Sequence, residues 1–356
     1  MDFEKRMPVT ITTVAKASPP HSRATKEIMP FLETWLAGQE PRFQRKVVKI
    51  FENAAVDQRY SIMDPEEVFT RTSFEEKNLI YRREVVKLGE TVVSQALAQA
   101  GWQATDLDFL ITVSCTGMMI PSVDAFLINS LQMRQDIVRL PVTEMGCVAG
   151  VSGLIYAKNF LKANPGKRAA VLAIEAPTAT FQLDDFSMAN IVSAAIFGDG
   201  AACVLVSSHP DDTGPEIIDE EMYHFYDAID IMGFDLTNSG LQMVLDKAVP
   251  ETIAAHFSAI VEPFLAKNGL TLGDVSHLIF HPGGKKIVET VEELFSAWNK
   301  NLDDTKEVLR QFGNMSSATV LYVLERFLQK QPEKGSIGLM LSFGPGFTAQ
   351  RVLLRW

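Results

Sequence analysis

Three side chains with the chemistry for acyl transfer are spread along the chain: Cys147, His281 and Asn314. Cys147 follows a short apolar run and Gly146, and small and apolar residues recur after it at helical spacing. We therefore expect a strand, a tight turn and a helix whose N-terminus holds Cys147. The unpaired N–H groups at such an end favour a thiolate, which would make this cysteine a nucleophile. A lone cysteine is more often a small buried apolar residue, so its role depends on its neighbours.

His281 and Asn314 have suitable groups for the rest of such a site. His281 directly follows the apolar run 278–280, and parallel sheets place ligands beyond the carboxyl ends of their strands. A histidine could hold Cys147 as a thiolate–imidazolium pair, and with the Asn314 amide it could stabilise an oxyanion or an enolate. Considered singly, His281 could be a strand-end histidine with satisfied hydrogen bonds, and Asn314 a helix cap. The chemical interpretation therefore requires the three residues to meet in one cavity.

Helices and strands are predicted to alternate along the chain. Apolar spacing predicts helices over 22–53, 75–100 and 124–133, and strands over 109–113, 169–174 and 201–206. Turn formers gather over 208–216 and mark a boundary between an N-terminal half, 1–210, and a C-terminal half, 211–356. This alternation indicates an α/β protein with mostly parallel sheets.

The second half repeats the first. At one constant interval, five positions recur with the same or a similar residue: Gly101, Asp106, Leu107, Leu110 and Ile111 correspond to Gly269, Asp274, Val275, Leu278 and Ile279. At an interval one residue shorter, Gly146, Leu154, Phe160 and Leu161 correspond to Gly313, Leu321, Phe327 and Leu328. The shared order predicts two copies of one α/β unit. Cys147 then corresponds to Asn314, and a pseudo-twofold axis would bring both to one cavity.

Composition excludes several classes of protein. The net charge of −11 argues against nucleic acid or an anionic membrane as the main partner. The 3 cysteines are far apart in sequence, which argues against a disulfide framework or a metal site. Residues 1–6 lack the apolar run of a signal peptide, and no run reaches the roughly 18 residues that a membrane span needs. We therefore expect a cytoplasmic protein without a transmembrane segment.

A cysteine hydrolase is the rival enzyme class. In papain-like proteases the histidine follows the cysteine by about 130 to 150 residues, an interval that Cys147 and His281 also satisfy. The papain signature around the cysteine is absent, however. A protease would also not need a duplication that places Asn314 opposite its cysteine. We rank hydrolysis below carbon–carbon bond formation.

Five motifs, in order, resemble those of type III polyketide synthases, the chalcone synthase-like branch of the thiolase superfamily. They are Gly146-Cys147-Val148-Ala149-Gly150, Phe197-Gly198-Asp199-Gly200-Ala201-Ala202, His281-Pro282-Gly283-Gly284, Gly313-Asn314-Met315-Ser316-Ser317-Ala318 and Phe343-Gly344-Pro345-Gly346. The last two distinguish this family from the related ketoacyl synthase III enzymes. The resemblance implies a homodimer of thiolase-like, five-layered αβαβα subunits that need no cofactor or metal. An acyl-CoA starter would load onto Cys147, and His281 and Asn314 would stabilise the enolate formed by decarboxylation of malonyl-CoA.

The resemblance also assigns residues to the substrate cavity. Phe197 matches the family's gatekeeper phenylalanine, although a core aromatic is the alternative. Met243 matches a second gatekeeper, and because methionine is flexible it suits a wider opening. Cys115 matches a cavity-lining cysteine of bacterial members, with core packing as an equal alternative. Further cavity positions fall on Thr180, Phe234 and Ser316, and on a floor loop of Gly344, Pro345 and Gly346.

The CoA phosphates need cations. The family's basic cluster here contains Asp57 where a lysine is expected, with Arg45, Lys46 and Lys49 as substitutes. We favour Lys285 and Lys286 for the tunnel mouth, although solvated lysines are an equal alternative. An acyl carrier protein could also deliver the starter.

Taken together, the sequence predicts a bacterial type III polyketide synthase. Met243 and the mostly apolar lining suggest a fatty acyl starter and an alkylpyrone or alkylresorcinol product. The alternative is a phloroglucinol- or tetrahydroxynaphthalene-type synthase that uses malonyl-CoA alone. A ketoacyl synthase III, a cysteine hydrolase and a non-catalytic scaffold rank lower.

Overall fold

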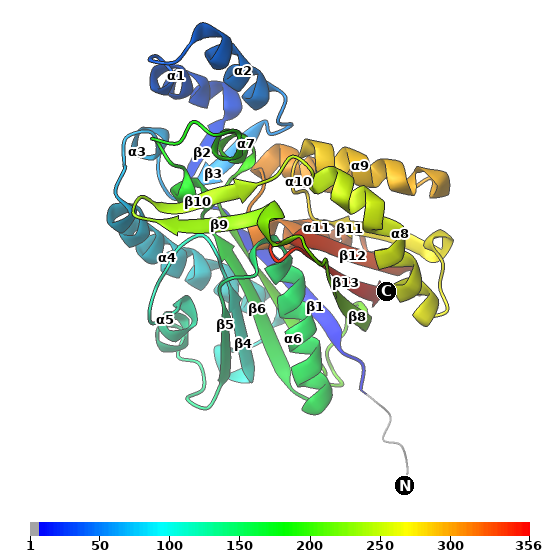
Figure 1. Cartoon of the computed structure of the whole chain (residues 1–356). Coiled ribbons are helices and arrows are strands. Elements are labelled where there is room, and N and C mark those ends of the chain that lie inside the picture. Colours follow the sequence, from blue (N-terminus) through cyan, green and yellow to red (C-terminus); the bar gives the residue numbers. More distant parts are fainter. Residues whose placement is uncertain (1–6) are drawn as a thin grey trace.

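The computed structural model describes residues 7–356 (Figure 1). Residues 1–6, on which part of the signal-peptide prediction rests, lie outside the described residues. Nine strands form one hydrogen-bonded series, in the order β11 (Val275–Phe280), β12 (Ile337–Gly344), β13 (Thr348–Arg355), β8 (Glu216–His224), β1 (Thr10–Ala17), β7 (Gly200–Ser207), β6 (Arg168–Glu175), β4 (Phe109–Val113) and β5 (Val138–Val142).

The strand order shows the predicted duplication. Outward from the centre of the series, the first half runs β1-β7-β6-β4-β5 and the second runs β8-β13-β12-β11, so each strand up to β4 has a counterpart. β1 and β8 pair through a single position, Thr10 with Glu216, so each half forms nearly a separate sheet. The fifth strand, β5, has no counterpart among the described strands of the second half.

The prediction of mostly parallel sheets is wrong. Only β4 with β5, β4 with β6, and β11 with β12 are parallel pairs among the described strands of the series. The other neighbours are antiparallel. A short turn suffices to join antiparallel strands such as β12 and β13, whereas a parallel pair needs a helical crossover.

The helices complete five layers. They are α1 (Thr25–Trp35), α2 (Pro41–Glu52), α3 (Pro65–Val68), α4 (Phe74–Ala100), α5 (Val123–Ser130), α6 (Ala149–Ala163), α7 (Met188–Ile196), α8 (Val249–Lys267), α9 (Lys285–Phe295), α10 (Asp303–Phe312) and α11 (Thr319–Lys330). α4 packs on β1, β7 and β6, while α8 and α9 share a core with β11–β13. Between the two sheets, α6 packs on β6 and β13, and α11 packs on β11 and β1. This is the αβαβα arrangement that the family resemblance implied.

Local structure repeats with the fold. Gly101 and Gly269 end α4 and α8 with φ angles of 69° and 68°, a left-handed conformation that favours glycine. Each is followed by a 3₁₀ turn, capped by Asp106 in one half and Asp274 in the other, and then by a strand. The two halves therefore share a helix–turn–strand unit in conformation as well as in sequence.

Two small sheets were not predicted. β2 (His21–Ala24) pairs with β3 (Gln58–Ser61), and β9 (Met232–Thr237) pairs with β10 (Gly240–Leu245). The β9–β10 hairpin lies across the end of the sheets, and α1 and α2 project beyond it (Figure 1). The strands of the two small sheets are short and only partly buried, so their sequences lack the apolar runs of the large sheet.

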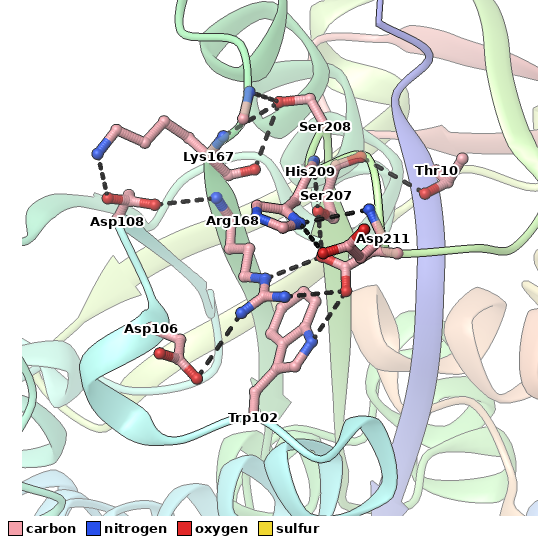
Figure 2. A network of polar contacts seen from close by, with 12 residues as sticks. Thr10, Trp102, Asp106, Asp108, Lys167, Arg168, Ser207, Ser208, His209 and Asp211 are labelled. Carbon is pink, nitrogen blue, oxygen red and sulfur yellow. Dashed lines mark hydrogen bonds and ion pairs between the residues drawn. The ribbon is translucent and has the colours of Figure 1, made fainter.

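The predicted boundary 208–216 is anchored to the first half (Figure 2). The Asp212 carboxylate accepts hydrogen bonds from Arg168 Nε at 2.8 Å and from Ser207 Oγ at 2.6 Å. The Arg168 guanidinium lies 4.5 Å from the ring centroid of Trp102. These contacts join the start of β6 to the end of β7, at the opposite end of the sheet from Cys147. The segment that connects the two halves is thus held against the N-terminal half.

Candidate active site

The structure brings Cys147, His281 and Asn314 together in one cavity, which Phe197 and Met243 also line. We call it the catalytic cavity. Cys147 lies in a 3₁₀ turn between β5 and α6, His281 directly follows β11, and Asn314 lies shortly before α11. The three residues thus come from both halves, as the duplication predicted.

A left-handed glycine sets the position of Cys147. Gly146 has a φ of 56°, and a Cβ atom there would lie 2.6 Å from Pro345 Cδ. The absence of a side chain at Gly146 therefore allows the Cys147 turn to pack directly on the loop Gly344-Pro345-Gly346. Gly313, directly before Asn314, also has a positive φ, of 72°.

The backbone of Asn314 is hydrogen-bonded to the segment around Phe197, the residue that the resemblance assigns as gatekeeper. Asn314 N donates to Ile196 O at 2.7 Å and Gly198 N donates to Asn314 O at 3.1 Å, so Phe197 and Asn314 form a parallel bridge. In the side chain, Oδ1 accepts from Ser316 N at 2.8 Å and Nδ2 donates to Gly283 O at 3.3 Å. An amide nitrogen carries two N–H groups, so one remains available to a ligand.

Burial keeps both titratable members of the trio uncharged. The His281 side chain is 3% exposed, its ring nitrogens have no hydrogen-bond partner, and burial lowers its pKa to about 3. Burial likewise raises the pKa of Cys147 to about 12. Among the described residues, no hydrogen bond joins the two side chains, so the structure does not contain the expected thiolate–imidazolium pair. Desolvation penalises both charges until a substrate provides compensating groups.

A second thiol lies beside the first. Ser316 Oγ is 3.7 Å from Cys147 Sγ and 3.5 Å from Cys115 Sγ, so one hydroxyl contacts both sulfur atoms. Cys115 Sγ is also 3.7 Å from Glu175 Oε1. Cys115 lines a cavity and is only partly buried, which favours cavity lining over core packing.

Sequence reasoning missed Glu175, which is fully buried at the end of β6. Its carboxylate accepts hydrogen bonds from Cys115 N at 2.9 Å, Thr116 Oγ1 at 2.8 Å and Ser317 Oγ at 2.6 Å. Burial raises its pKa even though these bonds favour the charged form. The available signal was a lone acidic residue directly after the apolar run 169–174.

Two further cavities adjoin the catalytic one. The outer chamber lies beyond Phe197 and Met243, which line it as well as the catalytic cavity, and Thr180, Phe51 and Phe69 contribute to its wall. The second, which we call the open cavity, adjoins the catalytic cavity at Met232, which lines both. Its volume is about 590 Å³, against about 40 Å³ for the catalytic cavity. Cys115, Phe234, Pro345 and Gly346 line the open cavity. Phe197 and Met243 thus stand between two cavities, where a gate would be.

The favoured lysines lie outside these cavities. Lys285 and Lys286 are exposed on the first turn of α9 and form ion pairs, Lys285 with Glu289 at 3.9 Å and Lys286 with Glu251 at 3.1 Å. Neither lines any of the three cavities.

A different set of cations lies nearer the outer chamber. Arg42, Arg45, Lys46 and Lys49 are exposed on α2, and none forms an ion pair within residues 7–356. Phe51 of the same helix lines the outer chamber. We call these four side chains the α2 basic face.

Two negative findings concern the described residues only. Between residues 7 and 356, no group of three or more His, Cys, Asp or Glu residues is arranged to hold a metal ion. In the same range, no helix is both long and apolar enough to cross a membrane.

Comparison with known families agrees with this geometry. Residues 3–210 match the family model for the N-terminal domain of chalcone and stilbene synthases, and residues 225–356 match the model for the C-terminal domain. The chain belongs to the chalcone and stilbene synthase family. It is a type III polyketide synthase, an acyltransferase that forms carbon–carbon bonds and needs no cofactor.

Individual relatives are similar over nearly the whole chain. The chain is 33% identical to 1,3,6,8-tetrahydroxynaphthalene synthase of Streptomyces peucetius subsp. caesius, over 98% of this chain and 93% of the relative. It is 28% identical to phloroglucinol synthase of Pseudomonas fluorescens, over 95% and 96% of the two chains. Among solved structures, 1,3,6,8-tetrahydroxynaphthalene synthase of Streptomyces coelicolor A3(2) superposes with a TM-score of 0.92 at 28% identity, covering 98% of this chain and 99% of that one.

Proposed function

We propose that the enzyme repeatedly condenses malonyl units onto an acyl group carried by Cys147. Neutral His281 takes the thiol proton as Cys147 attacks the starter thioester and passes it to the departing sulfur, so CoA leaves as a free thiol and His281 is neutral again. Malonyl-CoA then loses CO₂, and the His281 ring N–H and the free N–H of Asn314 stabilise the resulting enolate oxygen. The enolate carbon bonds to the acyl carbon while the bond from that carbon to Cys147 Sγ breaks. The extended chain is then a CoA thioester, and attack by the released Cys147 thiolate loads it again for the next round. The convergence of these three side chains in one buried cavity carries the proposal.

A fatty acyl starter is our first candidate. The side chains between the catalytic cavity and the outer chamber, Phe197 and Met243, are apolar, and so is most of the chamber wall. An alkyl chain would gain about 0.8 kcal/mol for each methylene that it buries there. The product would then be an alkylpyrone or an alkylresorcinol.

A synthase that uses malonyl-CoA alone is the second candidate. Two relatives named above are a tetrahydroxynaphthalene synthase and a phloroglucinol synthase. Phe234 favours this candidate as well, because its bulky ring occupies the wall of the open cavity where a growing chain would have to fold. Incubation with malonyl-CoA alone distinguishes the two candidates.

For the phosphates of an incoming CoA we propose the α2 basic face in place of Lys285 and Lys286. No carboxylate between residues 7 and 356 pairs with its four cations, whereas both lysines of α9 are paired. The same surface would suit the acidic helix of an acyl carrier protein, so starter delivery by a carrier is the competing outcome.

We also propose a cytoplasmic homodimer. Four large apolar residues at the rim of the open cavity are exposed: Met118, Ile120, Ile229 and Leu236. Ile120 is 92% exposed, and β5, beside the same cavity, is an edge strand of the series. Apolar rims of this kind mark interaction sites, and a second copy would cover this rim and close the cavity.

Radiolabelled malonyl-CoA tests the proposal, supplied alone and with acyl-CoA starters from acetyl to palmitoyl. We expect the wild type to form labelled polyketides, at the highest rate with long starters. We expect none from Cys147→Ala. Release of free acid without consumption of malonyl-CoA would instead indicate a hydrolase. If malonyl-CoA alone gave polyketides as fast as malonyl-CoA with an acyl-CoA starter, the second candidate would replace the first.

A further inference from the structure

Arg59 on β3 is a buried cation without an acidic partner. Its side chain is 5% exposed, and no carboxylate of residues 7–356 lies within ion-pair distance of it. Its guanidinium donates instead to neutral oxygens: Ala194 O at 2.6 Å, Ala195 O at 2.9 Å, Phe197 O at 3.4 Å and Thr25 Oγ1 at 3.2 Å. Burial lowers the pKa of Arg59 to about 10, so the group remains charged at neutral pH.

Two of these oxygens, of Ala194 and Ala195, belong to the last turn of α7, and a third belongs to Phe197 directly after it. The last carbonyl groups of a helix have no intrahelical partner and carry partial negative charge, which a cation stabilises. α7 ends at Ile196, and Phe197 leaves it in an extended conformation with φ −74° and ψ 145°. Arg59 therefore holds the backbone of the gate residue from one side.

Asn314 holds the same segment from the other side. It accepts from Gly198 N and donates to Ile196 O, as described above. Contact across this junction is close, because a Cβ atom on Gly198 would lie 2.3 Å from Phe312 O, and one on Gly313 would lie 2.7 Å from Ile196 O. A shift of residues 196–198 would therefore displace Asn314 as well.

Arg59 also contacts the entrance side of the enzyme. It lines the outer chamber, and its guanidinium carbon lies 5.8 Å from the ring centroid of Phe51 on α2. Its side chain thus connects α2, the gate segment and, through that segment, Asn314.

We propose that Arg59 is a positioning residue that sets both the gate at Phe197 and the orientation of Asn314. It acts through the carbonyl groups of residues 194–197 and does not touch the reacting atoms. The inference rests on the proposed function, since a gate has meaning only for an enzyme that loads Cys147.

The test compares Arg59→Met, which keeps length but removes the donors, with Arg59→Lys, which keeps the charge but loses the fork of donors. Two readouts separate positioning from folding: the ratio of products from long and short starters, and the kcat for decarboxylation of malonyl-CoA. We expect Arg59→Met to change the starter ratio at least fivefold and to lower the decarboxylation kcat about tenfold. Arg59→Lys should recover part of both.

Arg351→Met is the matched control. Arg351 is also buried and donates to a helix carbonyl, Ile260 O, but it lies on β13 against α8 and lines none of the three cavities. We expect it to lower the melting temperature without altering the starter ratio.

A milder pair of variants decides the question if Arg59→Met does not fold. Thr25→Val removes one acceptor of Arg59, while Thr25→Ser retains it, so only the first should shift the starter ratio. An unchanged ratio and decarboxylation kcat in every folded variant would overturn the inference. If the wild type itself consumed no malonyl-CoA, the proposed function would fail instead.

Discussion

At the scale of single residues, burial keeps the proposed nucleophile, Cys147, and the proposed base, His281, uncharged. A buried neutral pair costs less than a buried ion pair that lacks further hydrogen bonds, and the His281 ring nitrogens have none. The unpaired nitrogens are a structural cost that a substrate oxygen can offset. The site is therefore arranged for the charge that develops during reaction and not for the resting state.

The buried His281 predicts a pH dependence of stability. Its folded pKa, about 3, lies below the ordinary value of 6.5, so the unfolded chain binds the extra proton between these values. Stability is accordingly present above pH 6.5 and is lost as pH falls towards 3, by about 2 kcal/mol at pH 5. We expect His281→Asn to lose less stability than the wild type between pH 7.5 and 5, measured by urea unfolding. Equal losses in the two proteins would contradict the burial of a neutral imidazole.

At the scale of elements, two turns meet at the cavity floor. The Cys147 turn packs on the Gly344-Pro345-Gly346 loop only because Gly146 lacks a side chain. The family resemblance assigned both turns to the cavity, but the sequence did not predict their contact, because it joins segments almost 200 residues apart. Each glycine suggested a turn, but not the surface that the turn would meet.

Gly146→Ala tests this contact, with Gly166→Ala as the control. Both glycines have a positive φ, 56° and 81°, but a Cβ on Gly166 would meet nothing within 4 Å. The left-handed conformation should cost each variant about 1–2 kcal/mol, and the clash with Pro345 should cost Gly146→Ala about 1–3 kcal/mol more. Unfolding titrations and turnover assays measure both effects. Similar stability and full activity in the two variants would show that Cys147 does not depend on this packing.

At the scale of the whole molecule, the duplication was predictable because it leaves paired residues at constant intervals. Gly101 and Gly269, for example, must be glycine in both copies for the same conformational reason. The direction of the strands was not predictable in this way, because β1 and β13 have the same apolar pattern whether parallel or antiparallel to their neighbours. The ion pair of Lys286 was equally hidden, since Glu251 approaches from a different helix, whereas Lys285 and Glu289 are four residues apart on α9.

The exposed rim of the open cavity predicts a dimer. Ile120→Glu would place a charge where a second copy should bury an apolar side chain, so we expect a monomer with reduced activity. Trp298→Glu, at an exposed aromatic residue that lines none of the three cavities, should leave the dimer intact. Light scattering during size-exclusion chromatography measures both. A wild-type monomer, or a dimer that survives Ile120→Glu, would contradict the proposed interface.

The most direct test of the central claim is the mass of the enzyme after brief exposure to a starter acyl-CoA without malonyl-CoA. The wild type and Cys115→Ser should each gain one acyl group, mapped by peptide digestion to Cys147 and discharged when malonyl-CoA is added. Cys147→Ala should gain none, and its polyketide formation should fall by more than about 1,000-fold. An acyl group on Cys115, or product formation that survives Cys147→Ala, would contradict the assignment of Cys147 as the nucleophile.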